Sequence, residues 1–130
     1  MKKKSIWIID DDSIFKIIIK KIISKSEIFE NVETFSNGEE AILTLKNTLE
    51  KNNQIPNIIL LDIEMPIMDG WEFMSELNLL KQKMEELDIK IYISSSSIAA
   101  NDKIKADNNP CIKGFLTKPI SIQDLIKIAY

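Results

Sequence analysis

Short runs of apolar residues alternate with longer amphipathic stretches five times along the chain. The first apolar run, residues 6–9, ends at Asp10. Isoleucines then recur at helical spacing as far as Ile23, with Ser13 as the expected helix N-cap. The remaining strands are predicted at residues 31–35, 58–61, 91–93 and 112–116. The remaining helices are predicted to carry Ala41 to Leu49, to run from Gly70 to Leu87, to span residues 99–107, and to begin at a capping box of Ser121 and Asp124.

The runs at residues 6–9 and 58–61 are apolar throughout, which is typical of strands that helices cover on both faces of a parallel sheet. Five strand–helix units therefore predict an α/β fold with a doubly wound, five-stranded parallel sheet and helices on both faces. The length fits one domain, residues 1–130, and we expect no effector domain.

Ligands of such folds bind at the carboxyl ends of the strands, near the point where the strand order reverses. The residues at these ends are Asp10 and Asp11, Asp62, Ser94 and Ser95, and Thr117 and Lys118. Gathered carboxylates repel one another, and a hard divalent cation such as magnesium relieves the repulsion. A carboxylate beside such an ion can act as a nucleophile and form an acyl phosphate. A single aspartate after a strand is often only a helix cap, and Asp12 is expected to be a capping or solvated residue.

The composition narrows the chemistry further. The chain has no histidine, which excludes histidine-based general base catalysis and the usual zinc sites. All seventeen basic residues are lysines, so a bound phosphate would meet lysine charges, hydroxyls, backbone amides or a metal. The net charge of −3 gives no reason to expect nucleic acid as a partner. No window is long and apolar enough to span a membrane, and the single cysteine, Cys111, fits a cytoplasmic location.

The stretch IILLDIEMPIMDG, residues 58–70, resembles the acceptor segment of the receiver domain of two-component response regulators. Residues 8–12, Ile-Ile-Asp-Asp-Asp, are similar to the first strand and acidic pair of that family. Residues 114–119, ending in Thr-Lys-Pro, are similar to its lysine–proline segment. The resemblance covers residues 6–128 and implies the flavodoxin-like strand order 2-1-3-4-5 of a stand-alone, chemotaxis-regulator-like receiver.

The resemblance also implies roles for particular residues. Asp62 is similar to the phosphoacceptor, and Asp11 to the direct Mg²⁺ ligand, with Asp10 shaping the acidic pocket. Glu64 falls where the family supplies a backbone carbonyl to the metal. Lys118 is similar to the lysine that pairs with Asp62 and later with the phosphoryl oxygens.

Three further expectations come from the same resemblance. Ser95 is expected to be the switch hydroxyl, although Ser94, Ser96 and Ser97 remain alternatives. Phe115 stands where many receivers have the tyrosine that moves with this hydroxyl. The peptide bond before Pro119 is expected to be cis.

A receiver implies a signalling protein rather than a dedicated enzyme. Its phosphodonor would be a sensor histidine kinase or a histidine phosphotransfer protein, since this chain has no histidine. Its output would be contact with an unidentified protein at the face formed by the fourth helix and fifth strand. One alternative is a phosphatase of the haloacid dehalogenase type, but that class wants a second aspartate where Glu64 stands, together with a cap insertion. Another is a pseudo-receiver that binds partners without phosphorylation, which the presence of Asp11, Asp62 and Lys118 disfavours.

Overall fold

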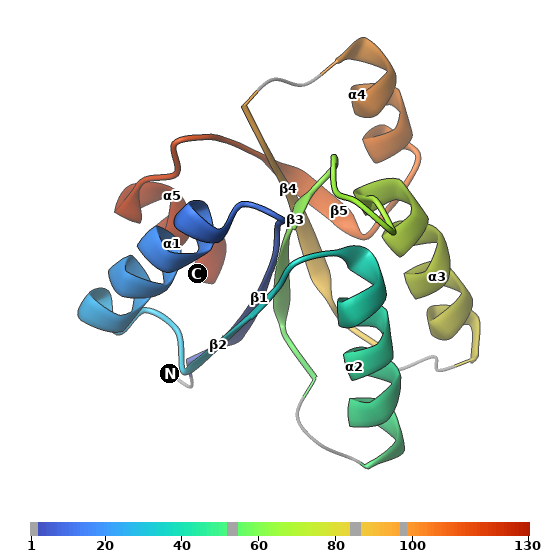
Figure 1. The fold of residues 1–130 in the computed structure, drawn as a ribbon, viewed down its shortest axis with the longest axis horizontal. Helices are drawn as coiled ribbons and strands as arrows, with labels where there is room; N and C mark the ends of the chain where they lie inside the picture. The colour runs from blue at the N-terminus through green and yellow to red at the C-terminus, as the bar shows by residue number, and fades with distance from the viewer. Residues whose placement is uncertain (1–2, 52–54, 84–86, 97–98) are drawn as a thin grey trace.

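The computed structural model describes residues 3–51, 55–83, 87–96 and 99–130, and for Lys83 the backbone alone. Within these ranges, strands and helices alternate strictly (Figure 1). The strands are β1 (Ser5–Ile9), β2 (Asn31–Phe35), β3 (Ile58–Asp62), β4 (Lys90–Ser95) and β5 (Ile112–Thr117). The helices are α1 (Ser13–Ser26), α2 (Gly38–Glu50), α3 (Gly70–Lys83), α4 (Ala100–Asp107) and α5 (Ile122–Ala129).

The five strands form one parallel sheet in the order β2-β1-β3-β4-β5. Both the doubly wound architecture and the strand order 2-1-3-4-5 are therefore confirmed. The order reverses at β1, because the chain first moves outward to β2 and then crosses back to β3. The carboxyl ends of β1 and β3 consequently lie side by side at the switch point, where such folds bind ligands.

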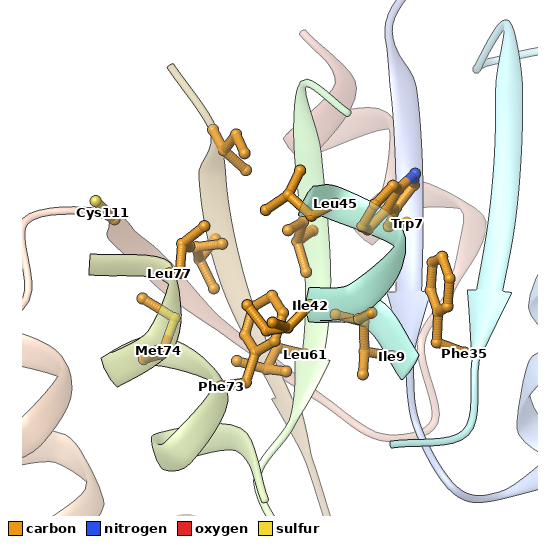
Figure 2. Packing of buried hydrophobic residues seen from close by; sticks show 14 of the residues in the cluster. Trp7, Ile9, Phe35, Ile42, Leu45, Leu61, Phe73, Met74, Leu77 and Cys111 are labelled. Carbon is orange, nitrogen blue, oxygen red and sulfur yellow. The ribbon is translucent and has the colours of Figure 1, made fainter. Parts of the chain in front are cut away.

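Each strand contributes alternate residues to two separate cores. On one face, Ile9 and Leu61 pack against α2 and α3 (Figure 2). On the other, Ile8 and Leu60 pack against α1 and α5. Burial on both faces explains the uninterrupted apolar runs of β1 and β3, whereas the edge strand β2 alternates exposed polar residues with partly buried ones. None of the described helices is long and apolar enough to cross a membrane.

The start of α1 corrects one prediction. Asp12, not Ser13, is the N-cap: its Oδ1 accepts hydrogen bonds from the backbone N–H groups of Ile14 at 3.0 Å and Phe15 at 3.1 Å. Both residue types cap helices well, and a carboxylate also interacts favourably with the helix dipole. The capping box of Ser121 and Asp124 at α5 is confirmed.

Two other element ends differ from the expected ones. Helix α3 is described as far as Lys83, so buried Leu87 follows the helix instead of lying on it, and Met84 is outside the described residues. Strand β4 continues through Ser94 and Ser95, which the apolar pattern had left beyond the strand. Ser94 keeps the strand geometry because it pairs with Asp62 of β3 and Leu116 of β5, and Ser95 because it pairs with Thr117 of β5.

Candidate functional site

Three carboxylates meet at the switch point of the sheet. Asp10 and Asp11 follow β1, and Asp62 is the last residue of β3. Ile9 pairs with Leu61 in the parallel register, so the next residues, Asp10 and Asp62, come together at the sheet edge. Asp10, Asp11 and Asp62 can each offer one carboxylate oxygen within 4.8 Å of the others. The structure thus brings together the acids that the strand ends predicted.

Asp10 is fully buried and tightly held. Its Oδ2 lies 2.7 Å from the Nζ of Lys118, and its Oδ1 accepts a hydrogen bond of 2.9 Å from the backbone of Asp12. The same ammonium lies 4.4 Å from the ring centroid of Phe15, which adds a cation–π contact. The family resemblance implied that Lys118 pairs with Asp62, but its ion pair here is with Asp10. The Asp10 carboxylate is shielded from solvent, whereas water still reaches that of Asp62. A charge shielded from solvent needs a counter-charge more, which explains why Lys118 pairs with Asp10.

Asp62 has a strongly raised pKa. Its pKa is raised from 3.8 to about 7, first by burial and then by the neighbouring charge of Asp10, with Asp11 adding a smaller repulsion. Lys118 and the backbone N–H of Ile63 act in the opposite direction and lower the pKa. Asp62 therefore remains short of positive charge, because the nearby ammonium is already paired with Asp10.

These residues fit a hard divalent cation. The donor set consists of carboxylate oxygens, which Mg²⁺ prefers, and the raised pKa of Asp62 reflects charge that a cation would neutralise. A hollow of about 470 Å³ adjoins the cluster and leaves room for retained waters. Its lining consists of Asp11, Ile63, Glu64, Met65, Pro66 and Asp69. The segment expected to supply a backbone carbonyl to the metal, at Glu64, is part of this lining.

The loop between β3 and α3 is tightly folded. Ile67 has a φ of 69°, a left-handed conformation that is uncommon for a β-branched residue and that nothing in the sequence pattern indicates. At the end of the loop, the N–H of Gly70 donates to the carbonyl of Ile63 at 2.8 Å. A Cβ at position 70 would come within 2.6 Å of the Asp62 carbonyl oxygen. Glycine is required there because α3 begins against the backbone of Asp62 itself.

The serines of β4 differ sharply in their surroundings. Ser94 pairs with Asp62 in the register and is 1% exposed, yet its Oγ has no hydrogen-bond partner within the described chain. Ser95 pairs with Thr117, is partly exposed, and accepts a hydrogen bond from the backbone N–H of Lys118 through its carbonyl at 2.9 Å. Successive strand residues point to opposite faces, so at most one of the two serines shares the face of Asp62. Ser97 lies outside the described residues.

Two other expectations can be placed. Phe115 is partly buried and packs against the core that α2 and α3 cover. The Lys118–Pro119 peptide bond is cis, as expected. Sequence reasoning missed Phe15 beside Lys118 and the strained Ile67. Nor did it indicate the orphaned hydroxyl of Ser94, since burial of a serine within a polar run has no sequence signal.

The protein is a doubly wound α/β protein with an acidic pocket at the switch point of its five-stranded sheet. A lysine from the end of the last strand reaches this pocket, and its carboxylates are of the kind that hard divalent cations prefer. The sequence model of the response regulator receiver domain matches residues 6–130. The chain belongs to this family. Receiver domains are signalling modules that take phosphoryl groups from histidine kinases and bind Mg²⁺ at an acidic pocket. The family assignment sets aside the haloacid dehalogenase alternative.

The relatives agree with this assignment. Chemotaxis protein CheY of Halobacterium salinarum is 29% identical over 127 residues, covering 95% of this chain and 93% of that protein. A protein-glutamate methylesterase/protein-glutamine glutaminase of Methanococcoides burtonii is 31% identical over 93% of this chain, which spans 31% of that protein's length. The crystal structure of a two-component response regulator from Cytophaga hutchinsonii aligns with a TM-score of 0.86 and 27% identity, covering 98% of this chain and 95% of that one.

Proposed function

We propose that this chain is a phosphorylation-dependent receiver in which Asp62 accepts a phosphoryl group from a sensor histidine kinase or a histidine phosphotransfer protein. The observation that carries the proposal is the combination of the Asp10, Asp11 and Asp62 cluster with Lys118 at one sheet edge. The donor histidine lies outside this chain, which contains none.

In the transfer step, a carboxylate oxygen of Asp62 attacks the phosphorus of a phosphohistidine in line with the P–N bond. The new O–P bond forms as the P–N bond breaks, and the imidazole leaves with the bonding electron pair. Asp11, Asp62 and the backbone carbonyl of Glu64 would hold Mg²⁺, which supplies positive charge beside the phosphoryl oxygens. Deprotonated Asp62 is the nucleophile, so its raised pKa makes cation binding part of its activation.

Lys118 then changes partners. Its ammonium pairs with Asp10 before transfer, and the phosphoryl group introduces a more strongly charged acceptor a short distance away. The ammonium moves toward the phosphoryl oxygens, while the Ser95 hydroxyl turns inward and Phe115 follows it. The output is a changed protein–protein contact at the surface of α4 and β5, in the cytoplasm.

The test compares the wild type with Asp62→Asn after incubation with MgCl₂ and acetyl phosphate, followed by intact mass measurement. We expect a phosphorylated species in the wild type alone, and none when EDTA replaces magnesium. Lys20→Ala, on the exposed side of α1, is the matched control and should be phosphorylated like the wild type. Equal phosphorylation of Asp62→Asn would move the acceptor elsewhere. No phosphorylation of the wild type by acetyl phosphate or by a histidine kinase would favour the pseudo-receiver alternative.

A further inference from the structure

Trp71 joins α3 to α4 through two contacts. Its indole Nε1 donates a hydrogen bond of 3.0 Å to the Oδ1 of Asp102, 31 positions away in the sequence. The Nζ of Lys105 lies 5.4 Å from the centroid of the same indole. Asp102 and Lys105 are one turn apart on α4, so one ring contacts an acceptor and a cation on the same helix face. We call this set of three residues the indole clamp.

Among the residues that the structure describes, few other contacts fix the position of helix α4. It has only eight residues, and Ala106 is the one that is buried. Its N-cap residue, Ala99, provides no side-chain hydrogen bond, and the apolar Ile104 is 59% exposed. A polar helix of this length is marginal by itself and depends on tertiary contacts. The indole clamp therefore contributes a large share of what holds α4 beside the start of α3 (Figure 1).

The clamp is also directly connected to the acceptor. Trp71 follows Gly70, whose Cα has space for no side chain because the Asp62 carbonyl oxygen would lie 2.6 Å from a Cβ. The Gly70 N–H donates a hydrogen bond of 2.8 Å to the Ile63 carbonyl. Backbone thus contacts backbone between Asp62 and the first turn of α3, and no flexible side chain can absorb a displacement. A displacement of the Asp62 backbone is therefore passed to Gly70 and then to the adjacent residue, Trp71.

We infer that the indole clamp couples Asp62 to α4: Trp71 holds α4 in its unphosphorylated position, and the change at Asp62 weakens the Trp71–Asp102 hydrogen bond. This inference rests on the proposed function and names a regulatory contact of the same site. In this proposal the clamp belongs to the unphosphorylated state and stabilises it relative to the phosphorylated one. By linkage, loss of the clamp favours the phosphorylated arrangement and tightens the binding of a phosphoryl mimic by the same factor.

The test measures beryllofluoride binding with MgCl₂ by calorimetry and the hydrogen exchange of α4 amides without either. Trp71→Phe keeps an aromatic ring at this position but removes the N–H donor, and Asp102→Ala removes the acceptor. Each should bind beryllofluoride about three- to tenfold more tightly than the wild type, the range expected for one hydrogen bond. Each should also exchange α4 amides faster before any ligand is added. The double variant should match the single ones, since all lack the same bond.

Two matched variants serve as controls. Asp102→Asn keeps an acceptor oxygen, and Lys103→Ala changes an exposed residue of the same helix, so both should stay within about twofold of the wild type. Unchanged or weaker beryllofluoride binding by Trp71→Phe and Asp102→Ala would overturn the coupling, even if α4 exchanges faster. If the α4 amides of these two variants exchanged no faster than those of the wild type, the inference that the clamp anchors α4 would be overturned. If the wild type did not bind beryllofluoride, or if Asp62→Asn bound it equally well, the proposed function and the coupling would both be overturned. The hydrogen-exchange data would still test whether the clamp anchors α4.

Discussion

The Nζ of Lys118 lies 2.7 Å from the Oδ2 of Asp10, although 108 positions separate the two residues. Lys118 follows β5, while Asp10 follows β1, and β3 and β4 lie between these strands in the sheet. The ion pair therefore connects strand ends that are separated by β3, which ends in Asp62, and by β4. The ammonium of Lys118 pairs with the buried carboxylate of Asp10, so the carboxylate of Asp62 has no ion-pair partner of its own in the cluster and its pKa is raised. We therefore expect the reactivity and the stability of the site to depend on the same residue, Lys118.

The first prediction concerns this ion pair. Lys118→Ala leaves the Asp10 carboxylate buried without a counter-charge and should lower the free energy of unfolding by about 3 kcal/mol. The measurement is urea denaturation in EDTA at neutral pH. In the double variant with Asp10→Asn, most of this loss should disappear, because a neutral amide needs no cation and can still accept from the Asp12 N–H. If the double variant were as unstable as Lys118→Ala, packing of the lysine stem, including its contact with Phe15, would explain the loss instead.

The second prediction follows from the pKa of Asp62, which is raised from 3.8 to about 7 in the folded chain. Between these values the folded chain holds a proton that the unfolded chain releases, so Asp62 makes stability fall as pH rises from about 4 to about 7. Asp62→Asn removes this cost. In EDTA, the variant should equal the wild type near pH 4 and exceed it by about 1–2 kcal/mol near pH 8, after allowance for solvent screening.

The measurement is urea denaturation of both proteins across this pH range. Added MgCl₂ should shrink the difference near pH 8, because a cation neutralises the Asp62 carboxylate of the wild type. An advantage of Asp62→Asn that is the same at low and high pH would contradict the assignment of the raised pKa to Asp62.

The fold could be predicted from the sequence because short β-rich segments alternate with helical patterns, and the central strands β1 and β3 are apolar runs that stop at an aspartate. The same pattern placed the three aspartates and Lys118 at one edge, since parallel strands end together. It could not choose the partner of Lys118, which depends on sheet twist and on which carboxylate loses its solvent. Ser94 and Ser95 looked like loop residues, because a strand that ends in polar side chains has no hydrophobic signal. The Trp71–Asp102 bond joins residues outside every motif, and only the folded chain brings them together.

The third prediction separates a side-chain ligand from a backbone one. Asp11 offers a carboxylate to the acidic cluster, whereas Glu64 is proposed to offer its peptide carbonyl. Asp11→Asn should weaken Mg²⁺ binding by about tenfold or more, because a charged ligand is lost. Glu64→Gln should change the affinity by about twofold or less, since the exposed side chain would act only through long-range charge. Thermal stabilisation by about 10 mM MgCl₂ reports the affinity. An equal loss in Glu64→Gln would make its carboxylate a ligand.

The last prediction concerns the buried serine beside the acceptor. Ser94 Oγ is desolvated and has no hydrogen-bond partner within the described residues, so it lacks compensation for the lost water contacts. Ser94→Ala should therefore leave the free energy of unfolding unchanged or raise it by about 1 kcal/mol, although truncation of a buried side chain usually destabilises. Ser95→Ala, the matched variant one residue later, should alter the response to beryllofluoride. Urea denaturation and beryllofluoride titration of both variants separate the roles. If Ser94→Ala lost the response to beryllofluoride and Ser95→Ala kept it, Ser94 would be the switch hydroxyl. Its Oγ would then gain a hydrogen-bond partner only when the phosphoryl group is present.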